Sequence, residues 1–161
     1  MTQEDKELLL KELSTRMPYG LKVNCKLKDE DYLFTFDEKH MGVGALYTDY
    51  YGNPLESPNI ILSGCYYGDD IKPYLFPLSS MTEEQRIELY KVLGWGYESH
   101  YHLSKEWEAF NDSIDNNDLF LPVSWVSDLN KMYNWLNKNH FDYRELIPLG
   151  LALDATGLNI Y

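Results

Sequence analysis

The sequence predicts an α+β domain in which a short antiparallel β-meander of about four strands packs with an N-terminal helix and two to three C-terminal helices. Strand-like alternation dominates the first half of the 161 residues, whereas helical spacing recurs in the second half. Short polar turns separate the strand-like runs. Since no internal repeat or Pro/Ser-rich linker divides the chain, a single globular domain over residues 1–161 is expected.

The first predicted element is a helix that begins after Thr2. Asp5 stands three residues later, which is the spacing of a capping box. Pro18 and Gly20 end the helix. Its apolar face is expected to contain the residues at helical spacing, Leu9, Leu10, Leu13 and Met17.

Four strands are predicted next. Residues 21–27 alternate strictly between apolar and polar side chains, which indicates a half-buried strand. The acidic residues 29–31 are expected to turn the chain into a second strand at 32–36. Residues 41–47 and 59–67 complete the meander.

A helix is predicted from Thr82 to about Leu93. Gln85 completes a capping box with Thr82, and Gly94 ends the helix. The preceding residues 72–77 contain two prolines, each of which removes a backbone donor, so neither a regular helix nor a central strand is expected there. No regular element is predicted over residues 95–111.

The last predicted helix covers residues 128–138 and is capped by Ser127 or Asp128. Its apolar face comprises Leu129, Met132, Tyr133 and Leu136. Asp142 and Glu145 predict the start of a further helical turn. The density of large apolar residues over 141–153 predicts that this segment packs as core, with a closing turn at residues 154–157.

Composition limits the classes of partner. Fourteen basic and twenty-six acidic residues give a net charge of −12, without a Lys/Arg cluster, so direct nucleic-acid binding is not expected. Apolar runs are too short to span a membrane, and no secretory signal is present, so we expect a cytoplasmic protein. Cys25 and Cys65 are expected to be reduced.

Catalytic chemistry has one weak candidate. His100 and His102, with Glu106 nearby, have a spacing that allows two imidazoles to share a metal ion, but a site needs a further ligand. No metal, cofactor or catalytic residue is therefore predicted.

Aromatic residues make up 15% of the chain. Tyr and Trp are enriched at binding surfaces because each joins a large apolar body to a polar tip. The cluster expected to form a partner-binding surface contains Trp95, Tyr97, Tyr101 and Trp107. A second group is expected to belong to the core, namely Trp125, Tyr133 and Trp135.

Three blocks, at residues 17–23, 72–85 and 135–155, resemble a group of short uncharacterised proteins encoded by gut anaerobic bacteria and their mobile elements. Relatives in that group often have Gly where this chain has Glu145, which bears on the backbone around that position. The resemblance implies a cytoplasmic bacterial accessory protein and no particular activity.

The sequence therefore favours a small non-enzymatic binding or regulatory module with a protein partner. One alternative is an enzyme whose site lies around His100, His102 and Glu106. Another is an acidic inhibitor that mimics nucleic acid.

Overall fold

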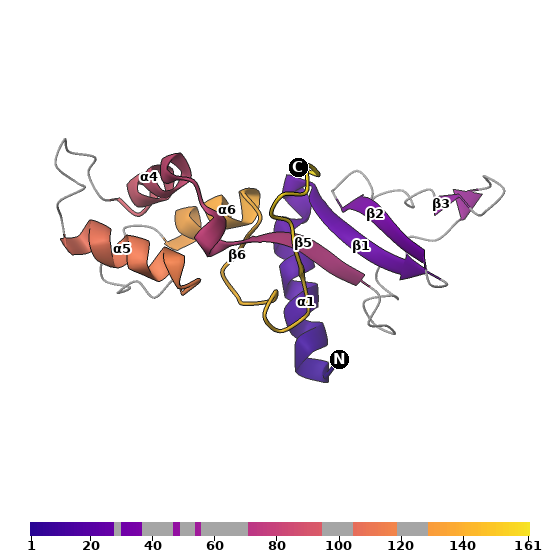
Figure 1. Ribbon diagram of the computed structural model, residues 1–161. Coiled ribbons are helices and arrows are strands. Elements are labelled where there is room, and N and C mark those ends of the chain that lie inside the picture. The colour runs from indigo at the N-terminus through magenta and orange to yellow at the C-terminus, as the bar shows by residue number, and fades with distance from the viewer. Residues whose placement is uncertain (28–29, 37–46, 49–53, 56–70, 95–104, 119–128) are drawn as a thin grey trace. The chain divides into compact units, whose positions relative to one another are not determined.

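The computed structural model describes all residues except 28–29, 37–46, 49–53, 56–70, 95–104 and 119–128 (Figure 1). The described residues contain an N-terminal helix, a sheet and later helices, which confirms the α+β class. No helix among them is long and apolar enough to cross a membrane.

The chain forms two compact units. The first comprises Met1–Tyr74 with Gly150–Leu153 and Asn159–Tyr161, and the second comprises Leu75–Leu149 with Asp154–Leu158. The expectation of one domain over residues 1–161 stays a prediction.

Helix α1 (Gln3–Arg16) begins as the sequence predicts. The Thr2 hydroxyl accepts from the Asp5 backbone N at 3.1 Å, and the Asp5 carboxylate accepts from the Thr2 N at 2.6 Å. Leu9 and Leu13 are buried, but Leu10 is exposed, so its placement on the buried face is wrong. A 3-10 turn, η1 (Met17–Tyr19), leads to Gly20, whose φ of 72° ends the helical segment.

Strands β1 (Leu21–Leu27) and β2 (Glu30–Phe36) form an antiparallel hairpin, with Leu27 opposite Glu30. Asp31 lies within β2 opposite Lys26 and accepts from the Asn24 side-chain amide at 2.9 Å. The expectation that Glu30 and Asp31 belong to a turn is therefore wrong, because cross-strand partners compensate for their low strand propensity.

Only fragments of the next predicted strands lie within the described residues. Strand β3 (Tyr47–Thr48) pairs with β4 (Pro54–Leu55). The predicted run at 59–67 lies outside the described part of the chain, as does all of 41–47 except Tyr47.

Strand β5 (Ile71–Pro77) contradicts the expectation that residues 72–77 cannot form a central strand. The strand order is β2-β1-β5-β6, and β7 (Leu153–Asp154) also pairs with β5. The start of β5 pairs antiparallel with β1, and its end pairs parallel with β6 (Phe141–Asp142). Pro73 is the last residue of the first ladder and Pro77 the last of the second, so neither interrupts a continuous run of hydrogen bonds.

Three α-helices lie in the described part of the second unit. Helix α4 (Glu83–Val92) follows the 3-10 turn η2 (Leu78–Ser80) and has the predicted capping box of Thr82 and Gln85. The others are α5 (Lys105–Asp115) and α6 (Leu129–Lys138). Their core contains the buried residues Leu78, Met81, Leu89, Tyr90, Leu93, Trp107, Phe110, Ile114, Met132, Trp135, Leu136 and Phe141.

The segment after α6 contributes core side chains, as its composition predicts. Phe141, Leu146, Leu151, Ala152 and Ala155 are all buried. The predicted closing turn also forms. The Thr156 N donates to the Asp154 carboxylate at 2.8 Å, and Gly157 has a φ of 77°.

Candidate protein-binding surface

The sequence-predicted surface cluster is not brought together within the described residues. Trp95, Tyr97 and Tyr101 lie outside them, as do His100 and His102 and the side chain of Glu106. Trp107 is only 6% exposed and belongs to the core, so its assignment to a binding surface is wrong.

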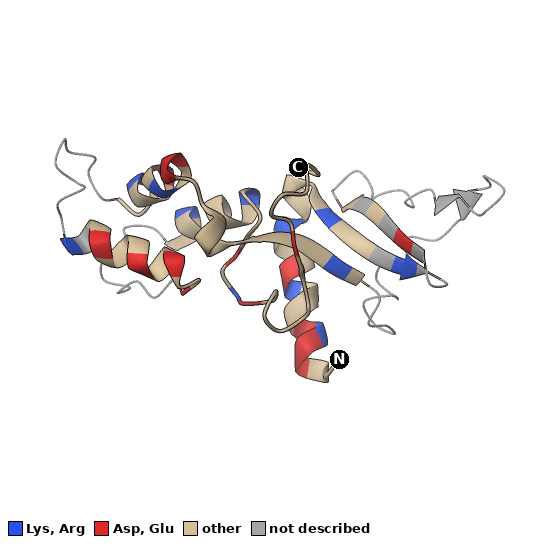
Figure 2. Ribbon diagram, viewed as in Figure 1, with Lys and Arg blue, Asp and Glu red and all other residues tan. Residues whose placement is uncertain are grey.

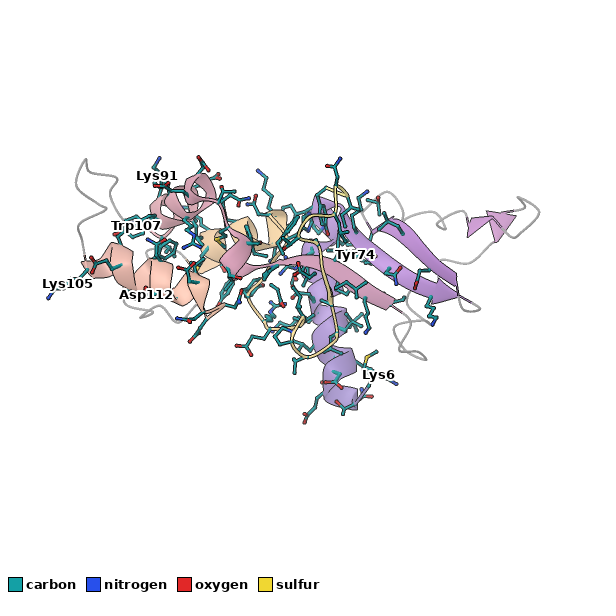
Figure 3. The ribbon with its side chains drawn as sticks, in the orientation of Figure 1. Lys6, Tyr74, Lys91, Lys105, Trp107 and Asp112 are labelled. Atoms are coloured by element: carbon teal, nitrogen blue, oxygen red, sulfur yellow. The ribbon has the colours of Figure 1, made fainter. Side chains whose placement is uncertain are left out.

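Trp107 is buried because α5 has an apolar face that the sequence analysis missed. Trp107, Phe110 and Ile114 recur at helical spacing, and all three are buried. The Trp107 ring packs edge-on against Tyr90 of α4, with 5.1 Å between centroids, and stacks on Phe110 at 5.5 Å. Figure 3 shows Trp107 between α4 and α5.

A shallow depression of about 350 Å³ lies beside Trp107 and is lined by Met81, Glu83, Arg86, Trp107 and Asn111. Arg86 donates to the Met81 carbonyl at 3.3 Å, to Asn111 Oδ1 at 3.2 Å and to Asp115 Oδ1 at 2.5 Å. These bonds tie α4 to α5, so the guanidinium has a structural role. The described residues that line the depression include no histidine beside a carboxylate. The described part of the chain also contains no group of three side chains that could bind a metal ion.

A different aromatic group lies on the surface of the second unit. The Tyr133 ring of α6 lies 5.3 Å from the ring of Tyr143, centroid to centroid, and the Arg144 Cζ lies over the Tyr143 ring, 4.8 Å from its centroid. Tyr133 is 41% exposed, and Tyr143 and Arg144 are half-buried. We call Tyr133, Tyr143 and Arg144 the Tyr–Arg stack.

Tyr133 is exposed, so the prediction that it belongs to the core is wrong. Leu129, predicted on the apolar face of the same helix, is exposed as well. The Tyr143 hydroxyl donates to Asn137 Oδ1 at 3.0 Å, and Asn137 is buried. The buried side of α6 therefore contains Met132, Trp135, Leu136 and Asn137, which turns Leu129 and Tyr133 toward solvent. Trp135 is buried as predicted, and Trp125 lies outside the described residues.

Tyr143 and Arg144 lie in a turn whose backbone is strained at Glu145. Asp142 is buried, and its carboxylate oxygens accept from the backbone N of Leu146 at 2.9 Å and of Ile147 at 2.7 Å. Glu145 has a φ of 59°, in the left-handed region that side chains other than Gly rarely adopt. The predicted helical start at Asp142 and Glu145 is therefore wrong, because a left-handed residue cannot continue a right-handed helix.

Charge also distinguishes α6. It carries Lys131 and Lys138 and no acidic residue. Each of the other described helices has more acidic than basic residues, and α5 has one Lys against four acids. Figure 2 shows the contrast between the red bands of α5 and the blue of α6. Tyr133 of the Tyr–Arg stack thus belongs to α6, the one described helix that has a net positive charge.

Comparison of the chain with protein-family models, curated proteins and solved structures finds no match.

Proposed function

We propose that the protein is a small, non-enzymatic binding module of the cytoplasm, of an accessory kind, and that it binds a protein partner through the Tyr–Arg stack. The observation that carries the proposal is an exposed Tyr133 next to an Arg-capped Tyr143. Tyr and Arg are among the residues that contribute most to binding energy at protein interfaces.

The stack is ordered before any partner arrives. Tyr143 is fixed at its hydroxyl by Asn137, and the turn that carries it is held by the buried carboxylate of Asp142. Binding then costs little side-chain entropy, and such preorganisation increases affinity without additional contacts. Left-handed residues other than Gly are enriched at segments that contact ligands, and Glu145, two residues after Tyr143, has such a backbone.

The test compares two variants with the wild type. Tyr133→Ala/Arg144→Ala removes the Tyr133 ring and the Arg144 guanidinium from the stack, and Leu33→Ala removes an exposed apolar side chain from the first unit. Each is used to capture proteins from a bacterial lysate, and the captured partner is then purified and titrated by calorimetry. We expect the stack variant to bind at least about tenfold more weakly, the effect of losing about 1.4 kcal/mol.

Circular dichroism melting curves establish that both variants are folded. Equal affinity of the partner for the wild type and the stack variant would overturn the proposal. So would an equal loss in Leu33→Ala, because the contact would then not be specific to the stack.

A further inference from the structure

We propose that the outer edge of β2 pairs with β2 of a second copy of this chain, antiparallel and centred on Leu33. The contact lies in the first unit and goes beyond the proposed function, because it does not involve the Tyr–Arg stack. β2 is the last strand of its sheet, and among the described residues it pairs with β1 alone (Figure 1). An edge strand presents a row of backbone donors and acceptors, and an extended strand is the partner that matches them.

The register shows which backbone groups point outward from β2. The Lys22 N donates to the Tyr161 hydroxyl, which bridges β1 and β5, so Lys22 directs its backbone groups toward β5. Because this direction alternates along an antiparallel strand, Leu21 directs its groups toward its β2 partner, Phe36. Every second residue of β2 before Phe36 likewise faces β1. The residues between them direct their N–H and C=O groups to the outer edge, namely Asp31, Leu33 and Thr35.

Leu33 is the centre of this edge and is complementary to its own copy. It is the middle residue of β2 and is 52% exposed. Among the described strand residues it is the one large apolar side chain that is exposed. A two-fold axis through Leu33 makes a hydrogen-bonded pair of the two copies of this residue, with their Cβ atoms about 5.5 Å apart. Both leucines then lose exposed apolar surface.

The flanking side chains are complementary as well. The same axis places Asp31 of each copy opposite Thr35 of the other, because each residue is two positions from Leu33. The Thr35 Oγ1 accepts from Lys22 Nζ at 2.6 Å, so its own proton can be donated to a carboxylate. Asp31 Oδ1 accepts from the Asn24 amide at 2.9 Å, and the second carboxylate oxygen can accept from Thr35. Hydrogen bonds therefore connect a lysine of one copy to an aspartate of the other.

This match favours a second copy over an unrelated strand and fixes the register. A shift of two residues would place Leu33 opposite Asp31, an apolar side chain against a charged one, and would lose the pairing of the two leucines. An unrelated strand could satisfy the same backbone groups, but it would need an apolar residue flanked by a carboxylate and a hydroxyl at the same spacing. A second copy has that arrangement by symmetry.

The association is expected to be weak and to depend on salt. One pair of edge strands buries less than the roughly 1,200 Å² at the lower end of stable interfaces. Each copy carries a net charge of −12, which opposes the contact at long range. The Debye length decreases from about 30 Å at 0.01 M to about 8 Å at 0.15 M ionic strength. We therefore expect tighter association at 0.15 M than at 0.01 M.

The experiment is sedimentation equilibrium of the full chain from micromolar to near-millimolar concentration. The wild type should form dimers. Leu33→Lys and Leu33→Glu should each associate at least about tenfold more weakly, because position 33 faces itself and like charges directly opposite each other are destabilising. The two variants change the net charge in opposite directions, so long-range repulsion cannot account for a loss in both. Leu10→Lys, at an exposed leucine of α1, is the control and should resemble the wild type.

Mixing the two charged variants completes the test. An equimolar mixture of Leu33→Lys and Leu33→Glu should form dimers, because opposite charges then meet across the axis. Circular dichroism melting curves establish that both are folded. A mixture that remains monomeric would refute the inference. So would a wild type that is monomeric at every concentration, and the edge would then be left to a strand of another protein. Tyr133→Ala/Arg144→Ala should dimerise like the wild type, and its failure to do so would place the contact on the second unit instead.

Discussion

The Tyr161 hydroxyl donates a hydrogen bond to the Tyr74 carbonyl at 2.6 Å and accepts one from the Lys22 backbone N at 3.1 Å. The register of β1 and β5 ends at Val23 opposite Pro73, and one further step would place Lys22 opposite Tyr74. The hydroxyl therefore occupies the next rung of the ladder, where it bridges the two strands. Tyr74 is labelled in Figure 3.

The position of this bridge in the ladder shows why Pro73 fits in β5. In an antiparallel pair, hydrogen-bonded and non-hydrogen-bonded positions alternate along the strand. Because the Lys22 N and the Tyr74 O both face the hydroxyl, theirs is the hydrogen-bonding position. Pro73, one residue earlier, then directs its donor-less nitrogen away from β1.

Tyr161→Phe should lower the free energy of unfolding by about 1–2 kcal/mol, because it leaves the Lys22 N and the Tyr74 O without this partner. Urea unfolding followed by circular dichroism measures the change. Tyr74→Phe is the matched control, since it also removes one hydroxyl but keeps the bridged carbonyl. Equal losses in the two variants would show that the bridge contributes nothing specific.

The free energy of unfolding should decrease above pH 10 because of the Tyr161 hydroxyl. Burial raises the pKa of Tyr161 to about 12, although the hydrogen bond from the Lys22 backbone and the positive charge of Arg16 lower it. A group whose folded pKa is raised stabilises the fold below its unfolded pKa near 10, and this contribution is lost as the pH rises toward 12. Unfolding curves between pH 10 and 12 should show that the difference in free energy of unfolding between the wild type and Tyr161→Phe decreases. A difference that stays constant over this range would contradict the raised pKa of Tyr161.

Glu145→Gly should stabilise the protein by about 0.5–1 kcal/mol. A left-handed backbone costs a non-glycine residue about 1–2 kcal/mol, which exceeds the loss from a more flexible unfolded chain. Thermal melting with Glu145→Ala as the control checks the prediction, since Ala keeps the strain. Identical melting temperatures for the Gly and Ala variants would argue against a left-handed conformation at this position.

Trp107→Ala should destabilise the protein by about 3–5 kcal/mol, as expected for a large aromatic removed from a packed core. Tyr133→Ala, which truncates an exposed ring, should cost less than about 1 kcal/mol. Chemical unfolding of the two variants distinguishes the core residue from the surface residue. A larger loss of stability in Tyr133→Ala than in Trp107→Ala would contradict the burial of Trp107.

Deletion of residues 146–161 should abolish cooperative unfolding. It removes the buried Leu146, Leu151, Ala152 and Ala155 together with the Tyr161 bridge. Burial of each large apolar side chain contributes about 1.5–3 kcal/mol, against a total stability of about 5–15 kcal/mol. A truncated protein that melts cooperatively near the wild-type temperature would show that the segment is dispensable.

Local interactions made several elements predictable from the sequence. The capping boxes at Thr2 and Thr82 join residues three apart, and the alternation over 21–27 repeats every two residues. The core role of the final segment follows from its apolar content, because such side chains are not stable in water. Short-range geometry and composition suffice for features of this kind.

The candidate site could not be predicted in the same way. Trp107 and Tyr133 are both aromatic residues at helical spacing, and only the neighbours of each helix decide that one is buried and the other exposed. Tyr143 meets Tyr133 because Asp142 and the left-handed Glu145 shape the turn between β6 and the segment that follows. Propensity rules describe isolated segments and so contain no information on these contacts.

The sequence by itself thus determined the fold class, the starts of α1 and α4 and the β1 strand, because these depend on neighbours along the chain. The tertiary structure alone decided that a proline-containing segment becomes a central strand and which aromatic rings face solvent. The physical reason is that the Pro73 nitrogen points away from β1, where this ladder needs no donor, and that Tyr161, 87 residues from Tyr74, bridges Tyr74 and Lys22 where the ladder ends.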